Sequence, residues 1–548
     1  MIELHRFPGG VHPEEHKTES SVRPIHAAFI PRKLVVPLHQ HIGQAAKPIV
    51  KVGDRVLKGQ MIAEADGYVS TAIHAPSSGT VIEIGPAAVP HPSDLPGLCI
   101  TIATDGKDEW GARQSLDWRN LDPAALRGYV RDMGIAGLGG AVFPTSVKLD
   151  PGQHQRVPTL ILNGCECEPW ITSDDRLMRE HASEIMQGAE IMRHLLQASE
   201  VIIGIEDNKP EAIAAMRAAA ERYSTATEIV AVPTIYPGGG AKQLTKTLTG
   251  KESGYGVRSA DIGVQVFNVG TAYALTRAIL HGEPLISRIV TVTGHVLRPQ
   301  NFEVLIGTPM SELLLHAGER EGLTGIIMGG PMMGFDVPNM DVPVVKATNC
   351  VLAKSAELFP PKPREMPCIR CTQCVIACPA ELQPQELYWF ARAKNFGKAQ
   401  EYHLFDCIEC GCCSYVCPSH IPLVDYYRFA KSEIWARDKE KRHADIARDR
   451  HEFRLFRLER EKKEKAERLA AKAQTKKAEA PSLSTTEQDA KKKLIAEALA
   501  RAQAKKSGIT PKNVDNLPTD KQTEIAEIEA RRAKIREIAK QPVEPEQH

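Results

Sequence analysis

Cysteine is concentrated in one short stretch of this chain. Nine of its 13 cysteines lie between Cys368 and Cys417. Eight of the nine form two runs with the same spacing, C-x2-C-x2-C-x3-C-P, the first starting at Cys368 and the second at Cys407. Three thiolates separated by two residues can bind three iron atoms of one cubane cluster within a single tight turn. The two runs therefore predict two 4Fe–4S clusters, which together would form a short electron relay.

The fourth cysteine of each run is expected to start the next helix and to point at the other cluster. A proline follows it in both runs, Pro379 and Pro418, where a backbone N–H group is dispensable. This cross-ligation predicts two sets of ligands. One set is Cys368, Cys371, Cys374 and Cys417, and the other is Cys407, Cys410, Cys413 and Cys378.

Structural zinc and disulfide bonds are the alternative uses of these cysteines. Zinc sites take four ligands, usually as two pairs, whereas each run here supplies four cysteines followed by proline. Disulfide scaffolds are short secreted chains, and iron–sulfur binding is therefore the preferred interpretation. Cys412 breaks the spacing and is not expected to be a ligand. Cys99, Cys350, Cys165 and Cys167 are expected to be thiols without a metal.

Size and composition set limits on the rest of the chain. The 548 residues suggest three or four domains at about 150 residues per domain. A formal net charge of +1 gives no electrostatic reason to expect nucleic acid as a partner. The first ten residues lack the apolar core of a signal peptide, and no apolar stretch approaches the ~20 residues of a membrane-spanning helix. A cytoplasmic protein is therefore expected, and docking on a membrane partner stays compatible with these features.

The periodicity of apolar residues differs between parts of the chain and divides it into segments. Residues 1–112 contain short strands and turns and resemble the barrel-sandwich fold of lipoyl carriers, but the comparable hairpin tip, residues 64–68, has no lysine, so a scaffold role is expected. Residues 113–285 alternate helices and strands, which predicts a Rossmann-like α/β domain with a largely parallel sheet. Its expected strands are 159–163, 201–205, 229–232 and 264–269, and its expected helices are 123–132, 174–196, 210–222 and 271–281.

The remaining parts are shorter or simpler. Residues 286–355 show short strands around one helix at about 310–317, which predicts a small α+β unit. Residues 356–432 hold both cysteine runs and are expected to form a ferredoxin-like domain. Residues 433–548 are rich in Lys, Glu and Ala, with breaks at Pro481 and Pro511, and have little apolar surface to bury. We expect a helical or disordered charged tail there.

A second stretch whose residues could bind a ligand, GLGGAVFPTSVK, runs from Gly137 to Lys148. Its glycines allow a ligand to approach the backbone, its N–H groups can cradle a phosphate, and Lys148 adds a cation. The stretch follows a helix rather than a strand, so it lacks the context of a dinucleotide-binding fingerprint. From the glycines alone, a plain loop is an equally good interpretation.

This stretch resembles the flavin-binding loop of the flavoprotein subunit of respiratory complex I, G-R-G-G-A-G-F-P-T-G-x-K. Residues 163–169, NGCECEP, are similar to N-A-D-E-S-E-P of that family, and residues 268–271, NVGT, are similar to N-V-E-T. With the β-sandwich in front and the cysteine runs behind, residues 1–430 resemble the C subunit of the Rnf electron-transport complex (RnfC). The tail is similar to that subunit in proteobacteria.

The resemblance implies a non-covalently bound FMN and a β-grasp fold for residues 286–355. FMN would lie against Gly137, Gly139 and Gly140, with Lys148 near its phosphate or ring and Asn163 at the isoalloxazine edge. Further contacts with the cofactor are implied for Tyr236, Asn268 and Thr271.

The resemblance also implies NADH as the substrate. Glu166 and Glu168 would line the nicotinamide side as catalytic residues, and Phe143 would stack with the nucleotide. The sequence departs from the complex I pattern at Leu138, Cys165, Gly240 and Ala241, which stand where that family has arginine, aspartate and two glutamates.

The function implied is that of the peripheral electron-input subunit of an ion-translocating NADH:ferredoxin oxidoreductase, a translocase on the cytoplasmic side of the bacterial inner membrane. Its partners would be the membrane subunits of the complex and a ferredoxin-like iron–sulfur subunit. Three alternatives remain: a flavin-free iron–sulfur wiring module between protein partners, an assembly scaffold, and a subunit of a soluble formate- or glutamate-linked dehydrogenase.

Overall fold

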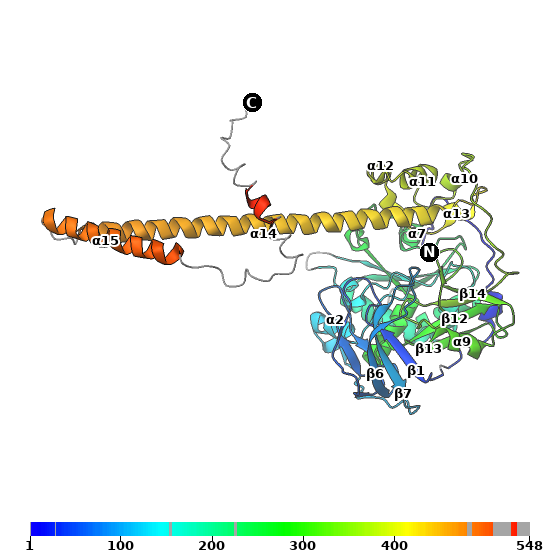
Figure 1. Cartoon of the computed structure of the whole chain (residues 1–548). Coiled ribbons are helices and arrows are strands. Elements are labelled where there is room, and N and C mark those ends of the chain that lie inside the picture. Colours follow the sequence, from blue (N-terminus) through cyan, green and yellow to red (C-terminus); the bar gives the residue numbers. More distant parts are fainter. Residues whose placement is uncertain are drawn as a thin grey trace. The chain divides into compact units, whose positions relative to one another are not determined.

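The computed structural model describes residues 2–27, 29–152, 156–223, 227–478, 485–507, 526 and 528–533. The chain divides into two compact units, Met1–Lys439 and Glu440–His548. Every residue predicted to hold a cofactor lies in the first unit, and Figure 1 labels some of its strands and helices.

Two small antiparallel sheets, formed by strands β1 to β7, pack against each other in the N-terminal part of this unit. One sheet has the order β1 (Lys33–Pro37), β7 (Gly97–Thr104), β6 (Gly79–Ala87) and β3 (Arg55–Val56). The other has the order β2 (Lys47–Pro48), β4 (Met61–Glu64) and β5 (Ile73–His74). Alternate residues of the strands, such as Leu34, Val36, Ile62, Ile100 and Ile102, fill the core between them. The predicted barrel-sandwich fold is confirmed.

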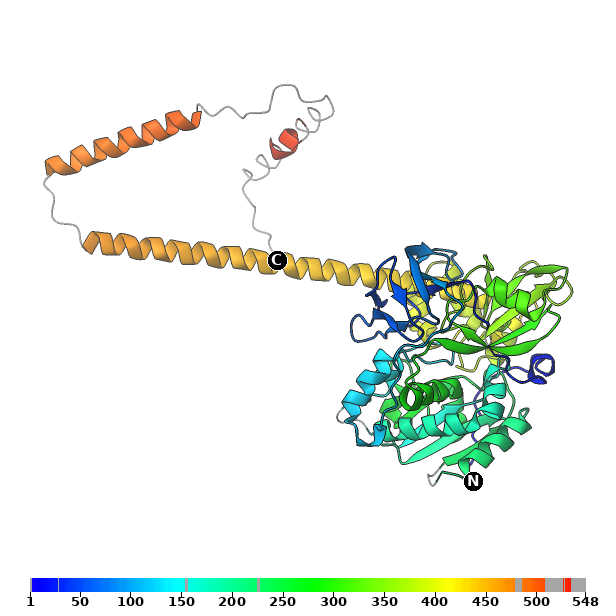
Figure 2. The same cartoon turned by 90° about the horizontal axis from the view of Figure 1, so that it is seen from below.

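The next part is a parallel sheet with helices on both faces (Figure 2). Its strand order is β10 (Thr227–Val232), β9 (Glu200–Glu206), β8 (Thr159–Asn163) and β11 (Val264–Asn268), and all three pairings are parallel. Its helices are α2 (Pro123–Asp132), α3 (Thr145–Lys148), α4 (Ser173–Glu180), α5 (Ala182–Leu196), α6 (Pro210–Ala220), α7 (Ala241–Thr249) and α8 (Val269–His281).

The sheet is buried on both sides because its strands are apolar at successive positions. Leu160 and Leu162 of β8 join the core formed with α5 and α8, whereas Ile161 joins the core formed with α7. The single helix expected at 174–196 is a wrong prediction, since α4 and α5 are separated at His181. This residue has the non-helical angles φ −127° and ψ 33° and caps both helices.

A five-stranded sheet follows in the order β13 (Gln300–Leu305), β12 (Ser287–Gly294), β16 (Cys350–Ser355), β14 (Leu323–Met328) and β15 (Phe335–Val337). Only the β12–β16 pair is parallel among these described strands. Helix α9 (Met310–Ala317) packs on this sheet through Leu313 and Leu314. This is the α+β unit predicted for the region.

The cysteine runs lie among short helices. These are α10 (Gln373–Ile376), α11 (Pro384–Arg392), α12 (Phe396–Glu401), α13 (Cys412–Tyr415) and the start of α14 (Leu423–Ala478). They share a core that includes Leu387, Tyr388, Leu404 and Tyr427. The described residues also contain the short 3-10 helices η1 (Trp118–Asn120), η2 (Ser259–Ile262) and η3 (Leu404–Asp406).

The second unit is helical where it is described. Helix α14 runs on to Ala478, and α15 spans Thr485–Ser507. The predicted breaks at Pro481 and Pro511 lie outside the described residues. Within the described ranges, no helix has the length and apolar character needed to span a membrane.

The N-terminal segment is a feature that the sequence did not predict. Residues 5–26, called the N-terminal strap here, precede the barrel sandwich and bond to other parts of the unit, and α1 (Thr18–Ser21) lies within the strap. The N–H of His5 donates to the carbonyl of Thr247 at 3.0 Å, and that of Gly10 donates to Ala377 at 3.1 Å. At its end, the N–H of His26 donates to Asn301 at 2.9 Å. The strap therefore joins helix α7, the cysteine segment and the five-stranded sheet.

Candidate functional site

The eight cysteines in register line two separate cavities. One cavity is bordered by Cys368, Cys371, Cys374 and Cys417. The other is bordered by Cys378, Cys407, Cys410 and Cys413. Each cavity thus receives three cysteines of one run and the fourth cysteine of the other, which is the grouping that cross-ligation requires. We call them the outer and the inner cysteine cavity, respectively.

The backbone of each run is shaped in the same way. Arg370 and Thr372 of the first run have φ of 56° and 64°, and Glu409 and Gly411 of the second run have φ of 57° and 82°. Left-handed residues alternating with ordinary ones turn successive N–H groups toward a common point, a concavity found at many iron–sulfur sites. Non-glycine residues in this region cost about 1–3 kcal/mol each, so the shape must be held by its surroundings.

The thiols themselves suit a cationic group. Burial raises the pKa of Cys407 to about 11 and also raises the pKa of Cys374 and Cys378. Thiolates at these positions therefore need a positive charge in the cavity, which iron supplies when it is bound. Backbone N–H groups of Leu382 and Glu409 donate to the Sγ atoms of Cys378 and Cys407, both at 3.4 Å, and such bonds tune cluster potentials. The residues present fit the clusters.

Cys412 differs from its neighbour Cys413. It lies outside both cavity linings, and its Sγ is 4.0 Å from the carbonyl oxygen of Tyr236. Its side chain is fully buried. The exclusion of Cys412 from the ligands stays a prediction.

The glycine-rich loop follows α2 and lies beside the C-terminal ends of the strands. The N–H of Leu138 donates to Oγ1 of Thr271 at 2.9 Å, which ties the loop to the start of α8. A Cβ atom on Gly139 would lie 3.2 Å from Cβ of Asn268, and Gly140 has φ of +103°. The left-handed φ favours glycine at Gly140, a side chain at Gly139 would crowd Asn268, and the exposed backbone of both residues leaves space for a ligand.

Two asparagines occupy matching positions at this edge of the sheet, since Asn163 of β8 and Asn268 of β11 are register partners. Asn268 caps α8 by accepting the N–H of Gly270 at 2.8 Å, and Asn163 donates to the carbonyl of Gly239 at 2.7 Å. The C-terminal edge of a parallel sheet is where ligands bind in such folds, and a helix N-terminus attracts phosphate. The edge therefore fits FMN.

Lys148 ends α3 and reaches under the edge. Its Nζ contacts the carbonyl oxygen of Val266 and lies 4.7 Å from the ring centroid of Phe267. Burial lowers the pKa of Lys148 to about 8. An ammonium group held in such surroundings gains from a nearby anion, which fits a phosphate.

Glu166 and Glu168 lie in the loop between β8 and α4, called the strand-end loop here (residues 164–172). The carboxylate of Glu166 accepts the N–H groups of Asp174 at 2.7 Å and Asp175 at 3.1 Å, and it thereby caps α4. The carboxylate of Glu168 accepts N–H groups from Met332 at 2.7 Å and Met333 at 3.1 Å. Both carboxylates have protein partners here, and their role toward NADH stays a prediction.

Tyr236 connects the two kinds of site. Its side chain is 3% exposed, and its hydroxyl donates to the carbonyl oxygen of Cys410 at 2.6 Å. Gly239, three residues later, accepts the bond from Asn163. The structure thus brings Gly137, Gly139, Gly140, Lys148, Asn163, Asn268 and Thr271 to one edge, with Tyr236 between that edge and the inner cysteine cavity. Phe143 takes part through its backbone, accepting the N–H of Gly137 at 2.8 Å.

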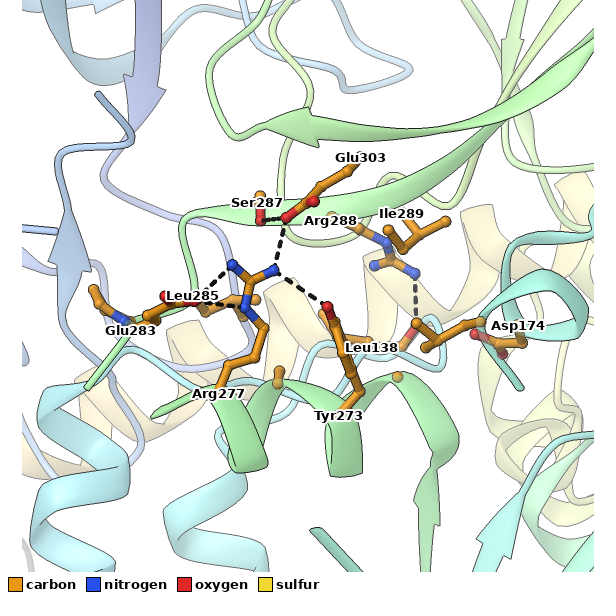
Figure 3. A pocket seen from close by; sticks show the side chains of 14 residues that line it. Leu138, Asp174, Tyr273, Arg277, Glu283, Leu285, Ser287, Arg288, Ile289 and Glu303 are labelled. Atoms are coloured by element: carbon orange, nitrogen blue, oxygen red, sulfur yellow. Dashed lines mark hydrogen bonds and ion pairs between the residues drawn. The ribbon is translucent and has the colours of Figure 1, made fainter. Parts of the chain in front are cut away.

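A pocket behind the glycine-rich loop shows residues that sequence reasoning missed (Figure 3). On one side Arg277 is paired with Glu283 and Glu303. On the other side Arg288 of β12, which is 6% exposed, donates to the carbonyl of Leu138 at 2.8 Å. A buried cation such as Arg288 carries no sequence signal, because the groups that accept its hydrogen bonds are backbone carbonyls far away in the chain.

A second buried cation acts on the same loop. Nζ of Lys346 donates to the carbonyl of Gly134 at 2.7 Å and to that of Ala72 at 3.3 Å. Burial lowers the pKa of Lys346 to about 7. The α+β unit therefore fixes the base of the glycine-rich loop from two sides.

Family models match four parts of the chain. They are described as RnfC barrel sandwich hybrid domain (residues 5–107), Nuo51 FMN-binding domain (130–277), SLBB domain (289–336) and 4Fe-4S dicluster domain (367–421). The fold and the site define an electron-transfer protein that carries FMN and two 4Fe–4S clusters.

Curated relatives identify the kind of electron-transfer protein. The chain is 48% identical over 542 residues to the C subunit of the ion-translocating oxidoreductase complex of Serratia proteamaculans (strain 568), covering 98% of this chain and 75% of that protein. It is 47% identical over 508 residues to the protein of the same name from Edwardsiella ictaluri (strain 93-146), covering 92% of this chain and 62% of that protein. The chain belongs to the family of C subunits of the ion-translocating oxidoreductase complex.

Among solved structures, an NAD+-reducing NiFe hydrogenase in its H2-reduced state is similar with a TM-score of 0.41 and 19% identity, over 56% of this chain and 61% of that one.

Proposed function

We propose that this protein oxidises NADH at FMN bound along the C-terminal edge of the parallel sheet and passes the electrons through both clusters to an iron–sulfur partner. When bound, FMN supplies the conversion of an electron pair into single electrons, and the clusters carry them singly. The glycine-rich loop, Asn163, Asn268 and Thr271 would hold FMN, with Lys148 at its phosphate. Glu166, Glu168 and Phe143 would face the nucleotide.

The bond from Tyr236 to Cys410 is the observation that carries the proposal. Residues 236–239 contact both the strand end at Asn163 and the inner cysteine cavity. This contact supports the inner cavity as the first cluster site after the flavin. The outer cavity would then hold the exit cluster, where Cys371 is exposed.

The surroundings of Cys371 support an exit there. Met366, Ile369 and Ile376 are 57%, 68% and 66% exposed. Exposed apolar surface of this kind is typical of protein interaction sites. We assign this surface to a ferredoxin-like iron–sulfur subunit of the complex. Membrane subunits would be the further partners, and the protein would lie on the cytoplasmic side of the inner membrane.

An anaerobic absorbance titration of the purified protein with NADH tests the proposal, with acid-released flavin and iron assayed on the same sample. We expect one FMN, about eight irons per chain and bleaching by NADH. Eight irons without flavin and without a response to NADH would leave only an iron–sulfur wiring module.

A further inference from the structure

Lys17 of the N-terminal strap makes an unusual set of contacts with the strand-end loop. Its Nζ donates to three backbone carbonyls, those of Glu166 at 2.8 Å, Glu168 at 2.8 Å and Ile171 at 2.7 Å. An ammonium group has three N–H donors, so all of them are used. The three acceptors belong to a single loop about 150 residues away in the sequence.

The loop needs such a partner because its backbone turns carbonyl groups inward. Glu166 and Trp170 have φ of 53° and 71°, a region that costs non-glycine residues about 1–3 kcal/mol. Carbonyl oxygens that converge on one point repel each other unless a cation lies between them. Burial lowers the pKa of Lys17, and the nearby positive charge of Lys209 lowers it further. The negative charges of Glu166 and Glu206 partly offset this shift.

The strap holds the loop at neighbouring points as well. The N–H of Trp170 donates to the carbonyl of Glu15 at 2.8 Å, and the Trp170 ring stacks on His16 with centroids 4.1 Å apart. Further along, the hydroxyls of Ser20 and Thr172 lie 2.8 Å apart. The two segments are therefore fixed to each other from Glu15 to Ser20.

We propose that Lys17 is a positioning residue for the NADH site, which sets the place of the Glu166 and Glu168 carboxylates through the backbone of the strand-end loop. The inference rests on the proposed NADH oxidation. The strap, although it precedes the barrel sandwich, acts on the nucleotide side of the flavin-binding domain. Without the ammonium group the three carbonyl groups move apart. The carboxylate of Glu166 then no longer caps α4, and that of Glu168 no longer accepts the N–H group of Met332.

The variant Lys17→Met removes the ammonium group and keeps the apolar stem. We expect FMN and iron contents like those of the unchanged protein, a KM for NADH raised about tenfold, and a smaller change in kcat, because misplaced binding groups mainly weaken binding. Lys251→Met is the matched control, since Nζ of Lys251 donates to a single carbonyl, that of Ile262 at 3.2 Å, and the residue is exposed. The control should keep its KM.

Hydrogen exchange measured without NADH separates this inference from the function it rests on. In Lys17→Met, the amides of residues 165–171 should exchange faster, whereas those of β9 should not. If the unchanged protein fails to respond to NADH, the proposed function is wrong and exchange still tests the position of the loop. A wild-type KM together with wild-type exchange in Lys17→Met overturns the inference.

If Lys17→Met does not fold or does not bind its cofactors, the variant Lys17→Arg tests the positioning role instead. A planar guanidinium keeps the charge but cannot direct three N–H groups at three converging carbonyls. A raised KM with full flavin and iron supports the positioning role, and an unchanged KM contradicts it.

Discussion

Adjacent thiols at Cys412 and Cys413 have different surroundings, and the difference is testable. Cys413 lines the inner cavity, whereas Cys412 packs against Tyr236. Cys413→Ala should remove one cluster and leave about four of about eight irons per chain. Cys412→Ala should keep them all, as measured by iron analysis and by the electron paramagnetic resonance of the reduced protein. Equal iron loss in both variants would contradict the ligand assignment.

A pH dependence of flavin binding follows from Lys148. Its pKa is lowered to about 8 by burial, so the ammonium is charged below that pH and neutral above it. The phosphate of FMN, with its second pKa near 6, keeps its charge above pH 7. FMN affinity should therefore be greatest near pH 7 and fall as the pH rises through 8, by about tenfold between pH 7 and pH 9.

Fluorescence titration of flavin-free protein with FMN measures this dependence. Lys148→Met should bind FMN weakly at both pH values and show no dependence on pH. An unchanged affinity of the original protein from pH 7 to pH 9 would mean that Lys148 is not at the phosphate.

At the scale of elements, local signals place most helices and strands well. Asp122 is a typical cap for the helix that begins at Pro123, and its carboxylate does accept the N–H groups of Ala124 at 2.9 Å and Ala125 at 3.1 Å. The strand predicted at 159–163 has those bounds. The break at His181 was missed because neither proline nor glycine marks it in the sequence, and helix α7 was missed as well.

The contact of strand β12 with the glycine-rich loop gives a prediction at the same scale. Arg288→Met removes the donor to the Leu138 carbonyl and should weaken FMN binding about tenfold, the worth of one bond to a charged group, with iron content unchanged. Arg298→Met is the matched control in the same unit, because exposed Arg298 donates to the carbonyl of His316 at 2.6 Å. If both variants bind FMN alike, β12 does not position the loop.

At the scale of the whole molecule, the two units differ in what they contain. Within the described residues, Ile434 is the last buried apolar side chain, and every predicted cofactor residue precedes it. A chain ending at Lys439 should therefore retain FMN, about eight irons and bleaching by NADH. The same titration measures this, and loss of either cofactor would show that the charged tail takes part in folding the first unit.

The sequence by itself determined the iron–sulfur clusters and the kinds of domain, and its resemblance to a known family pointed to FMN. Iron–sulfur binding follows from the spacing of Cys368 to Cys417, because the reach of a thiolate along a short turn is a local property of the chain. The strands and helices of the parallel sheet follow from local periodicity in the same way. Such signals do not depend on which segments meet in space.

Only the tertiary structure decided how the sites are joined and held. Several hydrogen bonds link residues that are far apart in the chain. Tyr236 donates to Cys410, Arg288 and Lys346 donate to the glycine-rich loop and its base, and Lys17 donates to the strand-end loop. In each case the acceptor is a backbone carbonyl, which every residue possesses. Because such an acceptor leaves no mark on the amino-acid sequence, these contacts become visible only once the chain has folded.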